Sequence, residues 1–170
     1  SQGRLEALLN FQTMVSDLTA LPVANASMLD ESSAAAEAVL LMRRANKAAV
    51  ESVTVLDANL FPQTIAVIQG RAEALGFETV VADLTSPGGN LPDAPISGIV
   101  LQQPGNNGAI IDQSEAIASA KARGAMVTVV ADLLALTLVT PPGEQGADIA
   151  VGSTQRFGVP LFFGGPHAAY

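Results

Sequence analysis

The chain has 170 residues, of which 49% are hydrophobic and 14% are charged, and its net charge at neutral pH is −8. This balance suits one packed α/β domain and excludes disorder, while the acidic charge without any basic stripe excludes nucleic acid as a partner. The absence of cysteine excludes disulfides, cysteine zinc sites and thiol catalysis in these residues, and no apolar run reaches the roughly 18 residues of a membrane span.

Two helices are predicted in the first part of the chain. Residues 4–19 carry apolar side chains at helical spacing, and Pro22 ends the pattern because the residue before a proline disfavours helix. Residues 31–47 are rich in alanine and contain neither proline nor glycine. Asp30 or Ser32 can cap the start of this second helix.

From residue 52 onward, β-branched runs alternate with helical patterns. Strands are predicted at residues 52–56, 77–81, 98–101, 125–131, 148–151 and 159–163. Helices are predicted at residues 63–75 and 113–122, and residues 133–138 fit either a buried turn of helix or extended chain. This alternation predicts a mostly parallel, open α/β sheet with right-handed crossovers and helices on both faces.

Four polar features are expected beyond the carboxyl ends of the strands, at the edge where open α/β sheets bind ligands. They are the loop 25–33 with Asn25 and Ser27, the turn-rich loop 102–108, Asp132 directly after a strand, and the segment 152–167 with Arg156 and His167. Each feature also has a plain structural interpretation. The first can be a capped helix, the second a connection, the third a helix cap and the fourth a structural histidine.

The familiar catalytic motifs are missing from the chain. No G-x-G-x-x-G follows a strand, and there is no Walker loop, no G-x-S-x-G and no pair of histidines. A free-standing nucleotide-binding module would suit the strand pattern but lacks its glycine fingerprint. One histidine and no cysteine leave no ligand set for zinc. The residue pattern alone therefore predicts an α/β domain with an aspartate at a strand end, and no particular function.

Several long blocks of sequence carry a family resemblance. They are residues 3–12 (Gly-Arg-Leu-Glu-Ala-Leu-Leu-Asn-Phe-Gln), 16–19, 24–31 (Ala-Asn-Ala-Ser-Met-Leu-Asp-Glu), 34–38, 145–149, 155–160 and 164–170 (Gly-Gly-Pro-His-Ala-Ala-Tyr). In this order, and over essentially all of the chain, they resemble the N-terminal half of the P proteins of the glycine cleavage system. The resemblance implies the large domain of a fold-type-I pyridoxal 5'-phosphate (PLP) enzyme. Residues 1–170 are then expected to form a single α/β domain, a piece of a longer protein, without the small C-terminal domain.

The resemblance also implies a reaction and its partners. The intact enzyme decarboxylates glycine and transfers the remaining aminomethyl group to the lipoylated H protein. The PLP ring acts as an electron sink in this reaction. The expected partner is the PLP-binding half or subunit, in a homodimer or a heterotetramer. The compartment would be the cytoplasm in a bacterium and the mitochondrion in a eukaryote.

One position departs from a working PLP site. The second half of family members carries His-Lys-Thr-Phe, two residues, Pro and then Gly-Gly-Pro, and the matching run here is Thr-Gln-Arg-Phe at 154–157 with the same offsets. Gln155 therefore stands where the Schiff-base lysine would be, and an amide cannot form an imine. Asp132 matches the aspartate that pairs with the pyridine nitrogen of the cofactor. We expect no catalytic residue in this chain, and the cofactor lysine is expected outside it.

Two roles remain open for such a half. Its residues can form part of the cofactor pocket of the catalytic half, and the candidates for this seam are Gln155, Arg156 and His167, then Asn25 and Ser27. Alternatively, the chain is a non-catalytic structural half that completes a dimer-like fold. In both cases we expect exposed apolar patches and self-association of the isolated piece.

Overall fold

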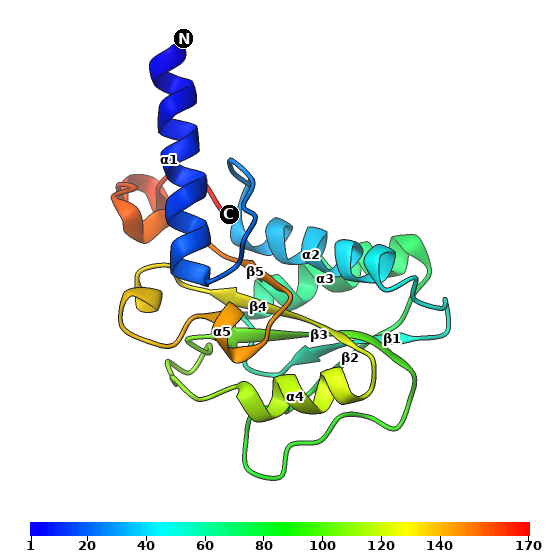
Figure 1. Ribbon diagram of the computed structural model, residues 1–170. Helices are drawn as coiled ribbons and strands as arrows, with labels where there is room; N and C mark the ends of the chain where they lie inside the picture. Colours follow the sequence, from blue (N-terminus) through cyan, green and yellow to red (C-terminus); the bar gives the residue numbers. More distant parts are fainter.

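The computed structural model describes residues 1–170, and a parallel five-stranded sheet lies at its centre, in the order β2-β1-β3-β4-β5 (Figure 1). The strands are β1 (Val53–Asp57), β2 (Thr79–Ala82), β3 (Ile96–Gln103), β4 (Met126–Ala131) and β5 (Ile149–Val151). All four neighbouring pairs run parallel. The predicted open, parallel α/β sheet is confirmed, and five of the six predicted strands lie within two residues of an observed one.

Helices cover both faces of this sheet. They are α1 (Gln2–Thr19), α2 (Glu31–Ala45), α3 (Pro62–Leu75), α4 (Ser114–Ala122) and the short α5 (Pro142–Gln145). Figure 1 shows α2 and α3 on one face and α4 on the other, while the N-terminal part of α1 extends away from the sheet. None of these helices is both long enough and apolar enough to cross a membrane.

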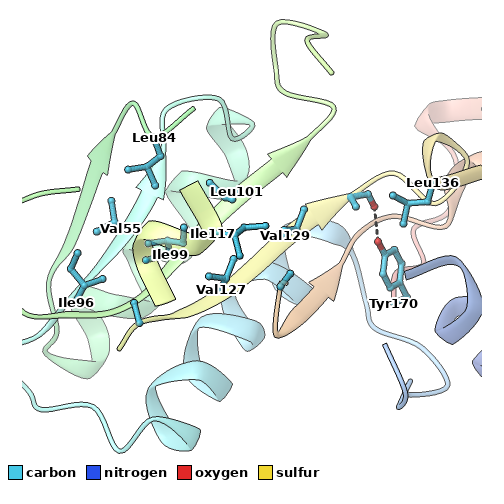
Figure 2. Packing of buried hydrophobic residues seen from close by; sticks show 14 of the residues in the cluster. Val55, Leu84, Ile96, Ile99, Leu101, Ile117, Val127, Val129, Leu136 and Tyr170 are labelled. Carbon is cyan, nitrogen blue, oxygen red and sulfur yellow. Dashed lines mark hydrogen bonds between the residues drawn. The ribbon is translucent and has the colours of Figure 1, made fainter. Parts of the chain in front are cut away.

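The buried core has two parts, one on each face of the sheet. Val55, Ile99 and Val129 belong to the cluster on the α4 face, whose packing Figure 2 shows. Leu56 and Val100 belong to the cluster with α2 and α3. Successive strand residues point to opposite faces, so a strand covered on both faces is apolar throughout. This is why the run predicted at 125–131 lacks polar alternation.

Local chemistry explains where α2 begins and ends. The Asp30 side chain accepts a hydrogen bond from the backbone N–H of Ser33 at 2.7 Å, so Asp30 is the cap of the two candidates. The helix ends at Ala45, and the prediction of helix to residue 47 is wrong by two residues. The Asn46 side chain donates to backbone carbonyls of two other segments, at 3.0 and 2.9 Å, and these bonds hold the chain out of the helical path.

The strand predicted at residues 159–163 is wrong. These residues are irregular chain that leads into a turn of 3-10 helix, Phe162–Gly164. Pro160 has no backbone N–H for a strand ladder, and Phe163 has a φ of 49°, which is incompatible with extended chain. The ambiguous residues 133–138 contain another 3-10 turn, Ala135–Thr137. The start of the predicted loop 102–108 is also wrong, because β3 continues to Gln103.

Large apolar side chains are exposed at several places, as expected for this chain alone. They include Leu5 and Leu9 on the extended part of α1, Val23, Leu138, Phe162 and the fully exposed Phe163. Self-association of the isolated chain stays a prediction.

Candidate functional site

A cavity of about 380 Å³ opens at the carboxyl ends of β3, β4 and β5, where the N-terminus of α2 also meets the sheet. Parallel strands end at one edge, so the residues that follow them come together there. The lining residues are Glu31, Phe61, Gln102, Pro104, Gly105, Asp132, Ser153, Gln155 and Arg156. Asp132, Gln155 and Arg156, predicted from the sequence, thus lie in one cavity.

Asp132 both caps a turn and binds a cation. Its backbone N–H donates to the carbonyl of Gln103 at 2.9 Å, which extends the contact between β3 and β4. Its Oδ1 accepts from the N–H of Leu134 at 2.9 Å, and its Oδ2 accepts from Nη1 of Arg156 at 2.6 Å. The Asp132 side chain is 21% exposed and that of Arg156 is 55% exposed. The cation beside this carboxylate therefore belongs to the protein itself.

Gln155 begins a turn of 3-10 helix, Gln155–Phe157, directly beside this ion pair. Its backbone N–H donates to Oγ of Ser153 at 3.0 Å, and its side-chain amide donates to the carbonyl of Val159 at 3.4 Å. Both bonds join Gln155 to residues within four positions of it, so they stabilise the turn in which it lies. An amide at this place can donate and accept hydrogen bonds, but it cannot act as a nucleophile.

Glu31 is a further titratable residue of the cavity, and the sequence analysis did not single it out. Its Oε2 accepts from the backbone N–H of Ser153 at 3.3 Å, which joins the start of α2 to the end of β5. Burial raises the pKa of Glu31, the carboxylates of Asp132 and Asp30 raise it further, and the Ser153 N–H opposes them. No local pattern marks this residue, since a glutamate in a first helical turn is common.

Gln102 belongs to the segment 102–108 that the sequence analysis singled out, and with Pro104 and Gly105 it lines the cavity. It is 3% exposed, and its Oε1 accepts no hydrogen bond from the protein. The chain around Gln102 looked like a loop because Pro104, Gly105 and Gly108 follow closely. Gln102 is instead one of the last residues of β3, and only the pairing of the strands shows where β3 ends.

The other three predicted residues lie outside the cavity. Asn25 and Ser27 are exposed on the segment before α2, and Asn25 lines a different, mostly apolar groove. His167 is exposed near the C-terminal end, after the glycines at 164 and 165. All three side chains are therefore accessible to another polypeptide, but they do not form one site with Asp132.

The residues of the cavity do not fit a covalently held PLP. Neither lysine of the chain lines it. Lys47 follows the C-terminal end of α2, a helix of 15 residues and therefore about 22 Å long, whose other end borders the cavity. Lys121 is bound to Asp148 and to the carbonyl of Gly146. The carboxylate of Asp132, which the resemblance assigns to the pyridine nitrogen of the cofactor, is already paired with a guanidinium.

Comparison with solved structures defines the class of this fold. Cystathionine gamma-lyase from Lactobacillus plantarum matches with a TM-score of 0.73 at 14% identity, over 94% of this chain and 40% of the lyase. A protein assigned as an O-acetylhomoserine (thiol)-lyase, from Campylobacter jejuni, matches with a TM-score of 0.71 at 14% identity, over 94% of this chain and 38% of its own. The fold is that of the fold-type-I PLP enzymes.

A more specific likeness identifies the family. The model of the glycine cleavage system P-protein family matches residues 1–170. A crystal structure of glycine decarboxylase (P-protein) of the glycine cleavage system, in inhibitor-bound form, matches with a TM-score of 0.89 and 37% identity over 99% of this chain. The chain belongs to the glycine cleavage system P-protein family. It spans 39% of the length of that glycine decarboxylase chain.

Proposed function

We propose that this chain is the part of a glycine decarboxylase that supports the catalytic site without holding the cofactor. Two features of the cavity support the proposal. Gln155 stands where the cofactor lysine is expected, and Arg156 occupies the carboxylate of Asp132 at 2.6 Å. A site without a lysine and with its acid already neutralised has no means to hold PLP covalently.

The proposed reaction of the intact enzyme is the decarboxylation of glycine with transfer of the aminomethyl group to the lipoylated H protein. Bound PLP supplies an electron sink for such a reaction. Support comes from the 37% identical glycine decarboxylase and from the C. jejuni protein, whose structure carries a pyridoxyl-lysine monophosphate. The PLP-binding half or subunit is the proposed partner, in a homodimer or heterotetramer. The proposed compartment is the cytoplasm or, in a eukaryote, the mitochondrion.

The proposed role of the chain's own residues follows from their contacts. The Asp132–Arg156 pair and the Glu31–Ser153 bond tie the ends of β4 and β5 and the start of α2 together. We propose that this edge faces the catalytic half, since the Arg156 side chain is 55% exposed there. We assign residues 1–170 to a single large-domain unit, and we place the small domain elsewhere in the full chain.

The first test asks whether this chain holds the cofactor. The purified chain is incubated with PLP and scanned near 400–430 nm, a rough expectation for lysine-bound cofactor, and then treated with borohydride. We expect neither a band nor an adduct. Adduct formation at a single lysine would overturn the proposal, whereas scattered, low-level labelling of both lysines would not.

The second test separates a lining role from a purely structural one. In the full-length enzyme, Arg156→Gln and His167→Gln are compared with Arg71→Gln, which removes a similarly exposed arginine from an ion pair with Glu37. If the chain lines the catalytic pocket, Arg156→Gln lowers glycine decarboxylation by far more than its small loss of stability, about 0.5–1 kcal/mol, accounts for. If the chain has only a structural role, activity falls in proportion to stability in all three variants.

A further inference from the structure

One buried side chain of the cavity at the carboxyl ends of β3, β4 and β5 has no partner. Gln102 lines this cavity and is 3% exposed, and its Oε1 accepts no hydrogen bond from the protein. The side chain of Gln113 does reach Gln102, but it donates to the backbone carbonyl, at 2.8 Å. Roughly nine in ten buried polar groups have a partner, so one without a partner is a place to look for a bound molecule.

Carboxylates lie beside Gln102 on the same side of the sheet. Val100 packs in the cluster with α2 and α3, so Gln102, two residues later on β3, points to that side as well. Glu31 at the start of α2 and Asp132 after β4 line the cavity with it. Oε2 of Glu31 accepts from the backbone N–H of Ser153 at 3.3 Å, which leaves Oε1 for another donor. This part of the cavity therefore offers several acceptors to one donor, such as a protonated amine.

The charges of the cavity also favour a cation. Arg156 is the only basic side chain that lines it, and it is paired with Asp132, so Glu31 is left without a positive partner. Burial raises the pKa of Glu31, because an ionised carboxylate is costly away from water when no cation lies beside it. A bound amine would supply that cation.

Donors lie nearer the mouth of the same cavity. The Arg156 side chain is 55% exposed, and only its Nη1 is bound within the protein, to Asp132. Oγ of Ser153 accepts from the N–H of Gln155 at 3.0 Å, which leaves the hydroxyl proton of Ser153 for another acceptor. A guanidinium and a hydroxyl are suitable donors to a carboxylate. The cavity thus has its acceptors deeper and its free donors toward solvent.

The size and lining of the cavity limit what can bind there. Its volume of about 380 Å³ lies within the range of about 300–1,000 Å³ that is typical of small-molecule sites. Phe61 is the only large apolar side chain that lines it, so a ligand with a large apolar side chain would gain little. No lysine lines it, so no imine can form there. The ligand is therefore small, polar and held without a covalent bond.

We propose that this cavity is a second, non-catalytic binding site for a small zwitterionic amino acid. The ammonium group of the ligand donates to Gln102 and Glu31. Its carboxylate accepts from Arg156 and Ser153, nearer the mouth. Glycine is the smallest ligand of this class and is the probe used below. The inference goes beyond the proposed function, because a supporting half needs no such site.

Equilibrium dialysis of full-length P-protein with bound PLP counts the sites. The probe is glycine labelled at its methylene carbon, which decarboxylation does not remove, and H protein is left out so that the aminomethyl group has no acceptor. Gln102→Leu and Glu31→Gln change the cavity. The control Gln103→Leu changes the next buried glutamine, whose Oε1 also lacks a partner but which points to the opposite face. The control Glu37→Gln changes another glutamate of α2, outside the cavity.

We expect two glycines per PLP in the unsubstituted protein and in both controls. In Gln102→Leu and Glu31→Gln, one glycine should remain and the other should bind at least about tenfold more weakly, because each change removes a contact to a charged group. Gln102→Leu should also leave the unfolding temperature unchanged or raise it, since no bond within the protein is lost. A clear fall would show that the amide of Gln102 is bound within the protein, and would count against its role in the site.

Three results of the dialysis would overturn the proposal. One glycine per PLP in the unsubstituted protein would mean that water or the catalytic half fills the cavity. Two glycines in every variant would place the second site elsewhere, and none in the cavity variants would make the cavity a part of the catalytic site. A failure of the proposed function would instead appear as a PLP adduct on a lysine of this chain.

Discussion

Replacing Asp132 separates the two contacts of its carboxylate. Asp132→Asn keeps an oxygen for the N–H of Leu134 but removes the charge that Arg156 meets, whereas Asp132→Ala removes both contacts. The ion pair is partly screened, since the Arg156 side chain is 55% exposed, so its loss costs about 0.5–1 kcal/mol of unfolding free energy. Loss of the Leu134 bond adds about 1 kcal/mol, as for other capping side chains.

Urea unfolding of a double-mutant cycle measures the pair by itself. Asp132→Asn, Arg156→Gln and the double variant are compared with the unsubstituted chain, and the coupling energy should be about 0.5–1 kcal/mol, equivalent to roughly 1–4 °C in melting temperature. The exposed pair of Arg71 and Glu37, at 3.0 Å, is the control and should couple by less. Coupling above about 3 kcal/mol would refute the screened surface pair described above, since that value belongs to buried pairs. Equal stability of Asp132→Asn and Asp132→Ala would refute the capping contact.

Three further changes test other contacts of the same edge. Burial raises the pKa of Glu31 above its ordinary 4.5, so the folded chain favours the protonated carboxyl, and the stability that this protonation contributes is lost as pH rises from about 4.5 through the raised pKa. Glu31→Gln should therefore be more stable than the unsubstituted chain at pH 7, and its unfolding free energy in urea should depend less on pH. An unchanged pH dependence would contradict the raised pKa. A methyl group on Gly152 would overlap the carbonyl oxygen of Ala131, so Gly152→Ala should cost about 2–4 kcal/mol in the same assay. Its control, Gly70→Ala in α3 with open space around it, should stabilise by about 0.5–1 kcal/mol, and similar results for both would argue against the overlap. Tyr170→Phe leaves the buried carbonyl of Ala131 without its donor and should lower the melting temperature by an amount equivalent to about 1–2 kcal/mol; an unchanged temperature would mean that solvent reaches this carbonyl.

Regular elements could be predicted because their signals are local. The apolar spacing of residues 4–19 predicts α1, of which only Val15 and Thr19 are buried in this chain. The mostly apolar run before Asp132 reflects burial of both faces of β4. The failures came where local signals mislead. Residues 159–163 are as apolar as a strand, but Phe163 is fully exposed and its φ is positive. Gln102 is polar, and Pro104 and Gly105 follow it closely, yet it lies in β3, a strand that is buried throughout.

The sequence by itself determined the chemical inventory and the class of fold. The amide at Gln155, the lack of cysteine and the alternation of strands and helices are properties of residues and spacings, and no folding step changes them. Only the tertiary structure decided which side chains meet. Arg156 reaches Asp132 across 24 positions of chain, and Glu31 reaches Ser153 across 122, because parallel strands end at one common edge. The bridges of Ala169 to Met28 and to Ser153 have the same origin, because pairing between distant segments follows from their packing and not from their spacing.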